Sequence, residues 1–151
     1  MNNEEEEIME LVTKTFGELS NKELYEILRI RSSVFVVEQN CVYQDIDGID
    51  LDSIHFFLKE DEKIYAYLRS FIKEEGIVQI GRVLTTKRRE GLGQRLLKDA
   101  IEIIKSTQKP SSIYLEAQTY AIKFYEKEGF EVISEEFLED GIPHVKMLLK
   151  I

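Results

Sequence analysis

The chain of 151 residues is 43% hydrophobic and 32% charged, and it carries a formal net charge of −9. A chain of this length buries roughly 70% of its unfolded surface in one core, and none of its apolar runs approaches the roughly 20 residues that cross a membrane. The excess negative charge argues against a nucleic-acid binder, and a single cysteine, Cys41, excludes an internal disulfide and a cysteine cluster for a metal.

The first residues of the chain predict no export. Met1 to Asn3 precede a run of glutamates and lack the basic start and apolar centre of a secretory signal. The sequence contains no internal repeat and no proline-rich linker that would mark a domain boundary. We therefore expect one soluble, cytoplasmic domain over residues 1–151, with no membrane partner.

The first third of the chain predicts a strand, a helix and a loop. Residues 8–16 mix apolar and polar side chains as a strand does, and Ser20-Asn21-Lys22-Glu23 has the spacing of a capping box that starts a helix. The apolar stripe of this helix is formed by Leu24, Ile27, Leu28, Arg31 and Phe35. Residues 39–52 have the composition of a loop.

The remaining sequence predicts a mixed α/β fold with a largely antiparallel sheet. Aromatic and branched residues indicate strands at 53–58, 63–72, 77–85 and 113–117, and further strands near 130–137 and 145–150 around a turn at Glu139-Asp140-Gly141. Apolar periodicity predicts a helix over 94–106. A second helix over about 119–128 should end at Gly129, which suits a glycine cap.

The chemistry is concentrated where the strand ending at Thr85 meets the helix beginning near Gln94. The first-turn N–H groups of a helix lack internal partners and carry partial positive charge, so they form a site for a diphosphate. Gly91 and Gly93 allow close approach of an anion, and Arg88 and Arg89 add charge-assisted hydrogen bonds. Taken alone, the stretch fits a plain surface turn equally well. It fits neither the Walker pattern nor the dinucleotide fingerprint.

Two motifs resemble the GNAT superfamily of N-acetyltransferases. Arg88-x-x-Gly91-x-Gly93, after a strand and before a helix, is similar to the acyl-CoA motif of that family. Gln118-x-x-Ala121-x-x-Phe124-Tyr125-Glu126-x-x-Gly129-Phe130 resembles its later motif, with Gln118 in place of the usual asparagine. Segments 31–39, 80–83 and 139–144 resemble the ElaA-like branch, so the likeness covers most of the chain.

The resemblance implies a strongly bent sheet flanked by helices, in which strands 77–85 and 113–117 splay apart to admit the pantetheine arm of acetyl-CoA. The backbone of residues 83–85 would pair with that arm like an added strand, and residues 88–95 would hold the diphosphate. The residues that the resemblance assigns to the cofactor are Val83, Leu84, Thr85, Arg88, Arg89, Glu90, Gly91, Leu92, Gly93, Gln94, Arg95, Gln118 and Phe124.

The resemblance also implies direct attack of an amine on the acetyl-CoA thioester, with Tyr125 as proton donor to the leaving thiolate. A phenol of pKa about 10 is protonated at neutral pH and can donate in this way. By spacing alone, a core position beside Phe124 is favoured for Tyr125, and the resemblance reverses that preference. The base that deprotonates the amine stays open among water and four side chains, which are Glu38, His55, Glu116 and His144.

The acidic segment from Asp45 to Asp52 has two interpretations. Its glycine stands too early for a calcium loop, and no glutamate closes it, so a metal site is rejected. We expect either a solvated acidic loop or a surface that attracts a cationic amine acceptor. A noncatalytic acyl-CoA sensor and a protein-interaction module are the alternatives to an enzyme, and homodimerisation is left open.

Overall fold

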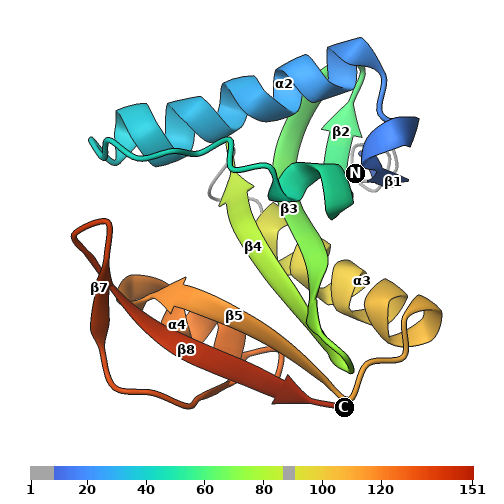
Figure 1. Cartoon of the computed structure of the whole chain (residues 1–151). Coiled ribbons are helices and arrows are strands. Elements are labelled where there is room, and N and C mark those ends of the chain that lie inside the picture. Colours follow the sequence, from blue (N-terminus) through green and yellow to red (C-terminus); the bar gives the residue numbers. More distant parts are fainter. Residues whose placement is uncertain (1–8, 87–90) are drawn as a thin grey trace.

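The computed structural model describes residues 9–86 and 91–151, and these residues form one bent sheet with helices on both faces (Figure 1). The strand order is β1-β2-β3-β4-β5-β8-β6, with β7 paired to β8. The strands are β1 (Glu10–Thr15), β2 (Ile54–Glu60), β3 (Lys63–Glu74), β4 (Ile77–Thr85), β5 (Ser112–Gln118), β6 (Glu131–Val132), β7 (Phe137–Glu139) and β8 (Ile142–Lys150). Within this part of the chain, β4 and β5 are parallel and the other pairs are antiparallel, as expected.

Within the described residues, three α-helices cover the sheet. In Figure 1, α2 (Asn21–Arg31) crosses one face, while α3 (Leu92–Thr107) and α4 (Ile122–Glu126) lie behind the strands. Helix α2 continues without a break into a π-helix, η2 (Ser32–Glu38), and short 3₁₀ turns form η1 (Phe16–Glu18), η3 (Ile49–Asp52) and η4 (Thr119–Ala121). No helix of the described chain is both long and apolar enough to span a membrane.

The sheet separates two hydrophobic cores because successive side chains of a strand point to opposite faces. On β2, Phe56 packs with Leu97 and Ile104 of α3, whereas the next residue, Phe57, packs with Ile27 of α2. All five side chains are buried. The alternation of apolar residues along β2 and β3 therefore fixes which helix covers which face.

The predicted capping box starts α2. The Ser20 hydroxyl accepts a hydrogen bond from the Glu23 N–H at 3.0 Å, and the Glu23 carboxylate accepts one from the Ser20 N–H at 2.8 Å. Glu23 is also 3.0 Å from the Lys14 ammonium on β1. The cap thus satisfies two orphan N–H groups and ties the helix to the edge of the sheet.

Strands β4 and β5 separate soon after they begin, as the sequence resemblance implies. They pair only at Ile77–Ser112, Val78–Ile113 and Gln79–Tyr114, and beyond these pairs they splay apart (Figure 1). A bulge in β4 adds to the divergence, because Arg82 adopts a left-handed φ of 53° where the register to β3 shifts. Bulges bend the strand that carries them.

The C-terminal region differs from the sequence prediction in its strand boundaries. Residues 130–137 do not form one strand, because the polar stretch Ser134-Glu135-Glu136, with both glutamates exposed, separates β6 from β7. Strand β8 begins at Ile142 rather than near Val145, since its first residues already pair with β7. The predicted turn is confirmed, with Asp140 and Gly141 both at positive φ.

The second predicted helix is shorter than expected. Residues 119–128 contain the 3₁₀ turn η4 followed by the one-turn helix α4. Its end is as predicted, because Gly129 has a φ of 98° and its N–H donates to the Glu126 carbonyl at 3.0 Å. The left-handed glycine turns the chain back toward β6.

Removing the Ser20 hydroxyl should destabilise the protein. Ser20→Ala leaves the Glu23 N–H without its side-chain acceptor, and we expect a loss of about 1 kcal/mol, or roughly 2 to 4 °C in melting temperature. Thermal unfolding followed by circular dichroism measures the loss. Ser106→Ala, which removes an exposed hydroxyl near the end of α3, is the control. Equal melting of the two variants would contradict the role of the cap.

Candidate active site

The beginning of α3 lies against the end of β4 and against α4. Gly91 precedes the helix with a left-handed φ of 68°, and the Arg95 N–H donates to the Gly91 carbonyl at 3.1 Å. Helix geometry leaves the N–H groups of Leu92, Gly93 and Gln94 without an intrahelical acceptor. This turn therefore presents adjacent N–H groups beside the gap between β4 and β5.

The two glycines of this turn serve different purposes. A Cβ atom on Gly91 would meet no atom within 4 Å, so glycine is required there by the backbone conformation. A Cβ atom on Gly93 would lie 2.9 Å from Thr85 Cγ2 and 3.5 Å from the Phe124 ring. Gly93 thus allows α3 to approach β4 and α4 closely, whereas the sequence attributed both glycines to approach of an anion.

Several side chains predicted to bind the cofactor have partners within the protein. Leu92 is buried in the core, Gln94 donates to Glu128 at 2.6 Å, and Arg95 donates to the Met9 carbonyl at 3.4 Å. These three side chains are thus engaged within the protein, and the backbone N–H groups of the turn have no such partner in the helix. Arg88, Arg89 and Glu90 lie outside the described residues.

The end of β4 provides a strand edge without a neighbour in β5. Val83, Leu84 and Thr85 all lie beyond the last β4–β5 pair, while their other edge is held by β3. Leu84 is buried beneath α2, and Val83 packs against the core on the α3 face. This stretch is therefore rigidly packed on both faces and open on one edge, which an extended ligand can fill.

Tyr125 lies on the α3 face of the sheet, in a setting of aromatic rings. Its ring contacts Phe124 at 5.0 Å and Phe130 at 6.0 Å between centroids, both edge to face. The side chain is buried. Burial raises the pKa of the Tyr125 phenol well above its usual value, so the hydroxyl keeps its proton at neutral pH.

Of the base candidates, His55 is held in the core beneath α2. Its Nε2 donates to the Asp50 carbonyl at 3.0 Å, and its Nδ1 accepts from the Tyr67 hydroxyl at 2.6 Å. Burial lowers the pKa of His55, which favours this neutral form. Both ring nitrogens are occupied, so His55 has none free to accept a proton from an amine.

The other candidates on the sheet, Glu116 and His144, lie on the face opposite Tyr125. They belong to neighbouring strands, because Glu116 pairs with Lys146 and Gln118 pairs with His144. Gln118 does not turn to the α3 face, since its amide donates to the Gln39 side chain at 3.4 Å. Glu38 ends the π-helix η2. The structure therefore brings Glu116 and His144 together and leaves His55 apart.

Three of the four carboxylates of the acidic loop are paired with arginines, so the loop is neither a simple solvated segment nor a surface of four free carboxylates, which corrects both interpretations of it. Its carboxylates meet three arginines from α2, β3 and β4, and the six residues are Asp45, Asp47, Asp50, Arg31, Arg69 and Arg82. Of the four aspartates of the loop, Asp52 is the one that stays exposed outside this network. The charges of the other three are matched inside the protein.

The contacts of this network are short, and four of its residues are buried, while Asp47 and Arg82 stay partly exposed. Arg31 is 2.6 Å from Asp50 and 3.1 Å from Asp45, Arg69 is 2.7 Å from Asp47, and Arg82 is 2.8 Å from Asp45. Arg31 is fully buried. One signal of this role is present in the sequence, because Arg31 falls on the apolar stripe of its helix, where a charged side chain needs a buried partner.

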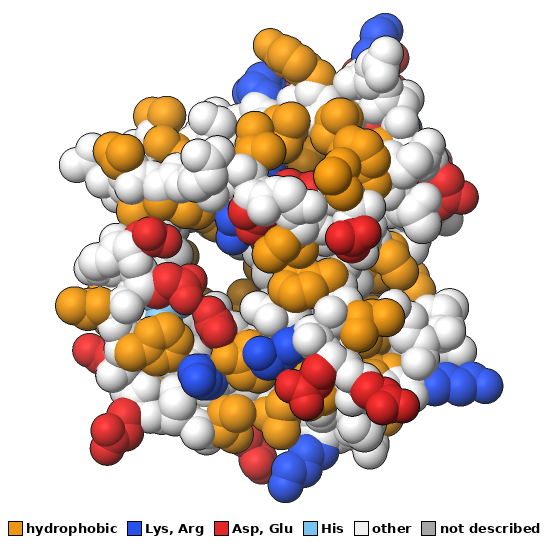
Figure 2. All heavy atoms as spheres, in the orientation of Figure 1, with side chains coloured by type: hydrophobic (Ala, Val, Ile, Leu, Met, Phe, Trp, Pro, Cys, Tyr) orange, Lys and Arg blue, Asp and Glu red, His pale blue; other side chains and the backbone are white. Residues whose placement is uncertain are grey.

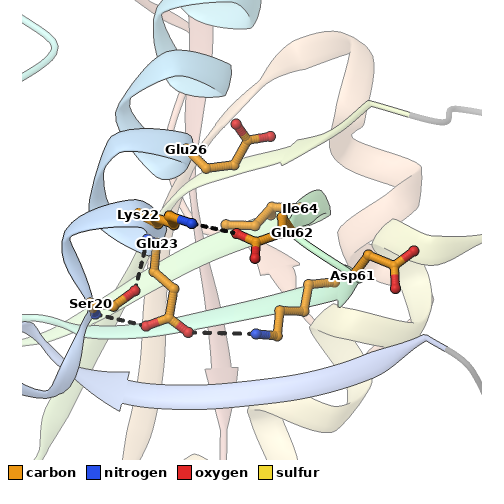
Figure 3. Close-up of a pocket in the computed structure, with 8 residues that line it drawn as sticks. Ser20, Lys22, Glu23, Glu26, Asp61, Glu62 and Ile64 are labelled. Atoms are coloured by element: carbon orange, nitrogen blue, oxygen red, sulfur yellow. Dashed lines mark hydrogen bonds and ion pairs between the residues drawn. The ribbon is translucent and has the colours of Figure 1, made fainter.

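A surface groove at the other end of α2 is not part of this arrangement. Figure 3 shows it between the first turn of α2 and the β2–β3 turn, with Lys22 facing Glu62 and with Glu23 bound to Ser20. Two ion pairs, Lys22–Glu62 and Lys59–Glu23, lie within its walls. None of the residues predicted for the cofactor or for catalysis lines it.

Comparison with known proteins finds relatives over nearly the whole chain. The model of the acetyltransferase (GNAT) domain family matches residues 14–151. A UPF0039 protein of Schizosaccharomyces pombe is 41% identical over 95% of this chain and 98% of its own length. The crystal structure of Escherichia coli ElaA is 37% identical with a TM-score of 0.88, covering 94% of this chain and 99% of that chain.

A further solved structure is described as an acyl-CoA N-acyltransferase from Pseudomonas aeruginosa. It is 38% identical, with a TM-score of 0.86 over 93% of this chain and 99% of that chain. The ElaA sequence itself is 39% identical over 89% of this chain and 92% of its own length. The splayed strands and the glycine turn therefore lie in a fold shared with these proteins.

The network of arginines and aspartates should make the free energy of unfolding decrease at acidic pH. Burial opposes ionisation of Asp47, but the hydrogen bonds and charge of Arg69 outweigh it and lower the pKa of Asp47 from 3.8 to about 2. The stabilisation is thus complete above the ordinary pKa and is lost as pH falls toward 2. Because the side chain is 24% exposed, screening limits its value to about 1 to 2 kcal/mol.

Asp47→Asn should therefore lower the free energy of unfolding at pH 7 by about 1 to 2 kcal/mol and much less at pH 2.5. Urea unfolding at the two pH values measures the difference. The control is Asp52→Asn, which changes an exposed carboxylate of the same loop and should have little effect at either pH. An equal loss from Asp47→Asn at both values would show that its charge is not responsible.

Proposed function

The chain belongs to the GNAT family of acyl-CoA-dependent N-acyltransferases, and we propose that it transfers an acetyl group from acetyl-CoA to a primary amine. The observation that carries this proposal is the juxtaposition of an open strand edge, a glycine turn at a helix start, and a buried, protonated tyrosine behind the gap. We place the reaction in the cytoplasm, because the single cysteine suits a reducing compartment.

The described residues fit a CoA thioester. The edge of β4 at Val83, Leu84 and Thr85 suits the extended pantetheine arm, whose amides can form hydrogen bonds with the strand. The first-turn N–H groups of α3 suit the diphosphate because they carry partial positive charge. Gly93 keeps this turn pressed against Thr85, so one ligand can contact both elements.

The reaction needs few groups from the protein. Acetyl-CoA supplies an activated carbonyl, and a neutral amine attacks that carbonyl directly. Tyr125 supplies a proton to the departing thiolate, since its hydroxyl is kept protonated by burial at the back of the gap. Solvent is held away from this hydroxyl by Phe124 and Phe130, which surround the ring.

Incubation of the purified protein with ¹³C-acetyl-CoA and pooled primary amines tests the proposal. We expect acetylated products by mass spectrometry and equal release of free CoA thiol. Calorimetry with CoA distinguishes the other outcomes. Binding of CoA without product from any amine would favour an acyl-CoA sensor, and absence of binding would favour a protein-interaction module.

Tyr125→Phe should preserve CoA binding and slow turnover. The substitution keeps the ring contacts and removes the hydroxyl, so turnover should fall by about 10² to 10⁴ if thiolate departure limits the rate. Single-turnover kinetics and a solvent isotope effect identify the limiting step. Tyr120→Phe is the matched control, because Tyr120 is 77% exposed in the preceding turn. If thiolate departure limits the rate and Tyr125→Phe still turns over as fast as the wild type, Tyr125 is not the proton donor.

Gly93→Ala should weaken CoA binding by forcing α3 away from β4. The added methyl would lie 2.9 Å from Thr85 Cγ2, so we expect roughly a tenfold rise in Kd for CoA. Adding Thr85→Ser removes the opposing methyl and should restore most of the affinity. Gly17→Ala, where nothing lies within 4 Å, serves as control. Calorimetry measures all four proteins, and no rescue by Thr85→Ser would refute the steric explanation.

A further inference from the structure

The face of the sheet opposite α3 and α4 carries polar side chains in the region where β4 and β5 part. Along β5, Ile113, Leu115 and Ala117 point into the core on the α3 face, so Tyr114 and Glu116 point to the other face. Figure 2 shows a hollow on this side, between the part of the molecule that contains α2 and the part that contains β5 and β8, with acidic and basic side chains on its walls.

The hollow is bridged by contacts across it. The chain that follows η2 reaches the opposite wall, where the Gln118 amide donates to Gln39 at 3.4 Å. The Cys41 thiol donates to the Asp140 carbonyl in the β7–β8 turn at 3.6 Å. The two contacts hold the walls of the hollow together in front of the splayed strands. A molecule in this hollow would face the gap from the side opposite Tyr125.

Two glutamates form a hydrogen-bonded pair on one wall of the hollow. Glu116 comes from β5 and Glu139 from β7, and their side chains share a hydrogen bond. The Tyr114 hydroxyl donates to Glu116 at 2.7 Å. The side chain of Glu139 is 45% exposed, so a ligand in the hollow can reach it. Two carboxyl groups bound in this way share a single proton.

The surroundings of the pair shift the pKa values of the two carboxyl groups in opposite directions. Burial opposes ionisation of Glu116, but hydrogen bonds from Glu139 and Tyr114 and the charges of Lys146 and Lys73 outweigh it and lower the pKa of Glu116. Burial and the neighbouring Glu116 raise the pKa of Glu139 to about 7. The pair thus takes up a proton near neutral pH, and Glu139 is its solvent-exposed member.

Other charged groups also face Glu139. Asp140 raises its pKa further, and Arg82 on β4 opposes that effect. His144 on β8 has its Nε2 3.9 Å from the Glu139 carboxylate, while its Nδ1 is 2.7 Å from the Ile142 carbonyl. The His144 ring stacks on Phe137 at 6.0 Å. These contacts hold His144 beside Glu139.

The pair stands at the open edge of the gap. Tyr114 is the last residue of β5 that pairs with β4, and Glu116 follows two residues later on the same face. Tyr125 lies on the other face, in the core with α3. A thioester held between the strands would therefore have a proton donor on one side and a carboxyl pair on the other.

We propose that Glu139, held by Glu116, is the general base of the reaction and the binding site for a primary aliphatic ammonium ion. The inference rests on the proposed acetyl transfer. With both carboxyl groups ionised, the pair attracts RNH₃⁺ and takes one of its protons. The nitrogen lone pair then forms the C–N bond, the C–S bond breaks, and the thiolate takes the Tyr125 proton. The second nitrogen proton of the tetrahedral intermediate passes to the Tyr125 oxygen, and Glu139 releases its proton to solvent, so one proton in total leaves with the products.

The first test needs no acceptor substrate. Glutamate carboxyl carbons of the full chain are labelled with ¹³C and titrated by NMR, with Glu116→Gln and Glu139→Gln to assign the signals. We expect two coupled steps, the upper near pH 7, and we expect butylammonium chloride to move the upper step to lower pH more than potassium chloride does. Independent titration of both groups below pH 5, or equal effects of the two salts, would overturn the inference.

The second test is the pH dependence of acetyl transfer to amines accepted by the wild-type protein, with butylamine in the panel. Wild-type kcat/KM should rise through a limb near pH 7. Glu139→Gln should lose this limb and fall by about 10² to 10⁴ in kcat/KM. Glu116→Gln should shift the limb to lower pH, because removal of the like-charged partner lowers the pKa of Glu139. Glu136→Gln, an exposed neighbour, is the matched control.

The outcomes separate the two proposals. A wild-type protein that acetylates no amine would overturn the proposed function and the base together. Amine acetylation that keeps its rate and its pH limb in Glu139→Gln would overturn the base alone. Circular dichroism and CoA binding of each variant show whether a loss of rate comes from unfolding. If a variant is unfolded, the NMR titration of the wild-type protein still tests the carboxyl pair.

Discussion

Backbone hydrogen bonds join β4 to β5 for three residue pairs and then stop, and the rest of the site depends on this loss of pairing. An interior strand edge normally has a partner, because buried N–H and C=O groups without one are costly. Here the edge of β4 beyond Gln79 is open to an extended ligand, and β8 supports β5 from the other side over its whole length. The bulge at Arg82 bends β4 away and so keeps the two edges apart.

The bulge is held by charge. Arg82 binds Asp45, and Asp45 also binds Arg31 at the end of α2, so the loop, the helix and the strand are fixed to one another. Removing one member of a buried set of this kind costs more than the set contributes, because an uncompensated charge stays behind. Within the described chain, Asp50 Oδ2 and Arg69 Nε still lack a hydrogen-bond partner, so the network is packed tightly rather than fully satisfied.

Where the two central strands splay apart, Tyr125 and the pair of glutamates lie on opposite faces of the sheet. Tyr125 lies in an aromatic setting that keeps its proton, and the Glu116–Glu139 pair lies in a polar hollow where a proton can be exchanged with solvent. Opposite environments push the pKa values of these groups in the directions that a donor and an acceptor need. In the proposed reaction, a thioester in this gap would lie between the two faces.

Local patterns in the sequence determined the elements. The capping box of Ser20, the periodicity of α3 and the Gly129 cap depend on neighbours within one or two turns, and the two motifs indicated the family because their residues are close in sequence. The tertiary structure alone decided the rest. The partners of Asp45 come from three separate elements, and Glu116 meets Glu139 only because β8 lies between β5 and β7. From sequence alone, a carboxylate is expected to be solvated. Its charge state is set by the distant side chains that the sheet brings next to it.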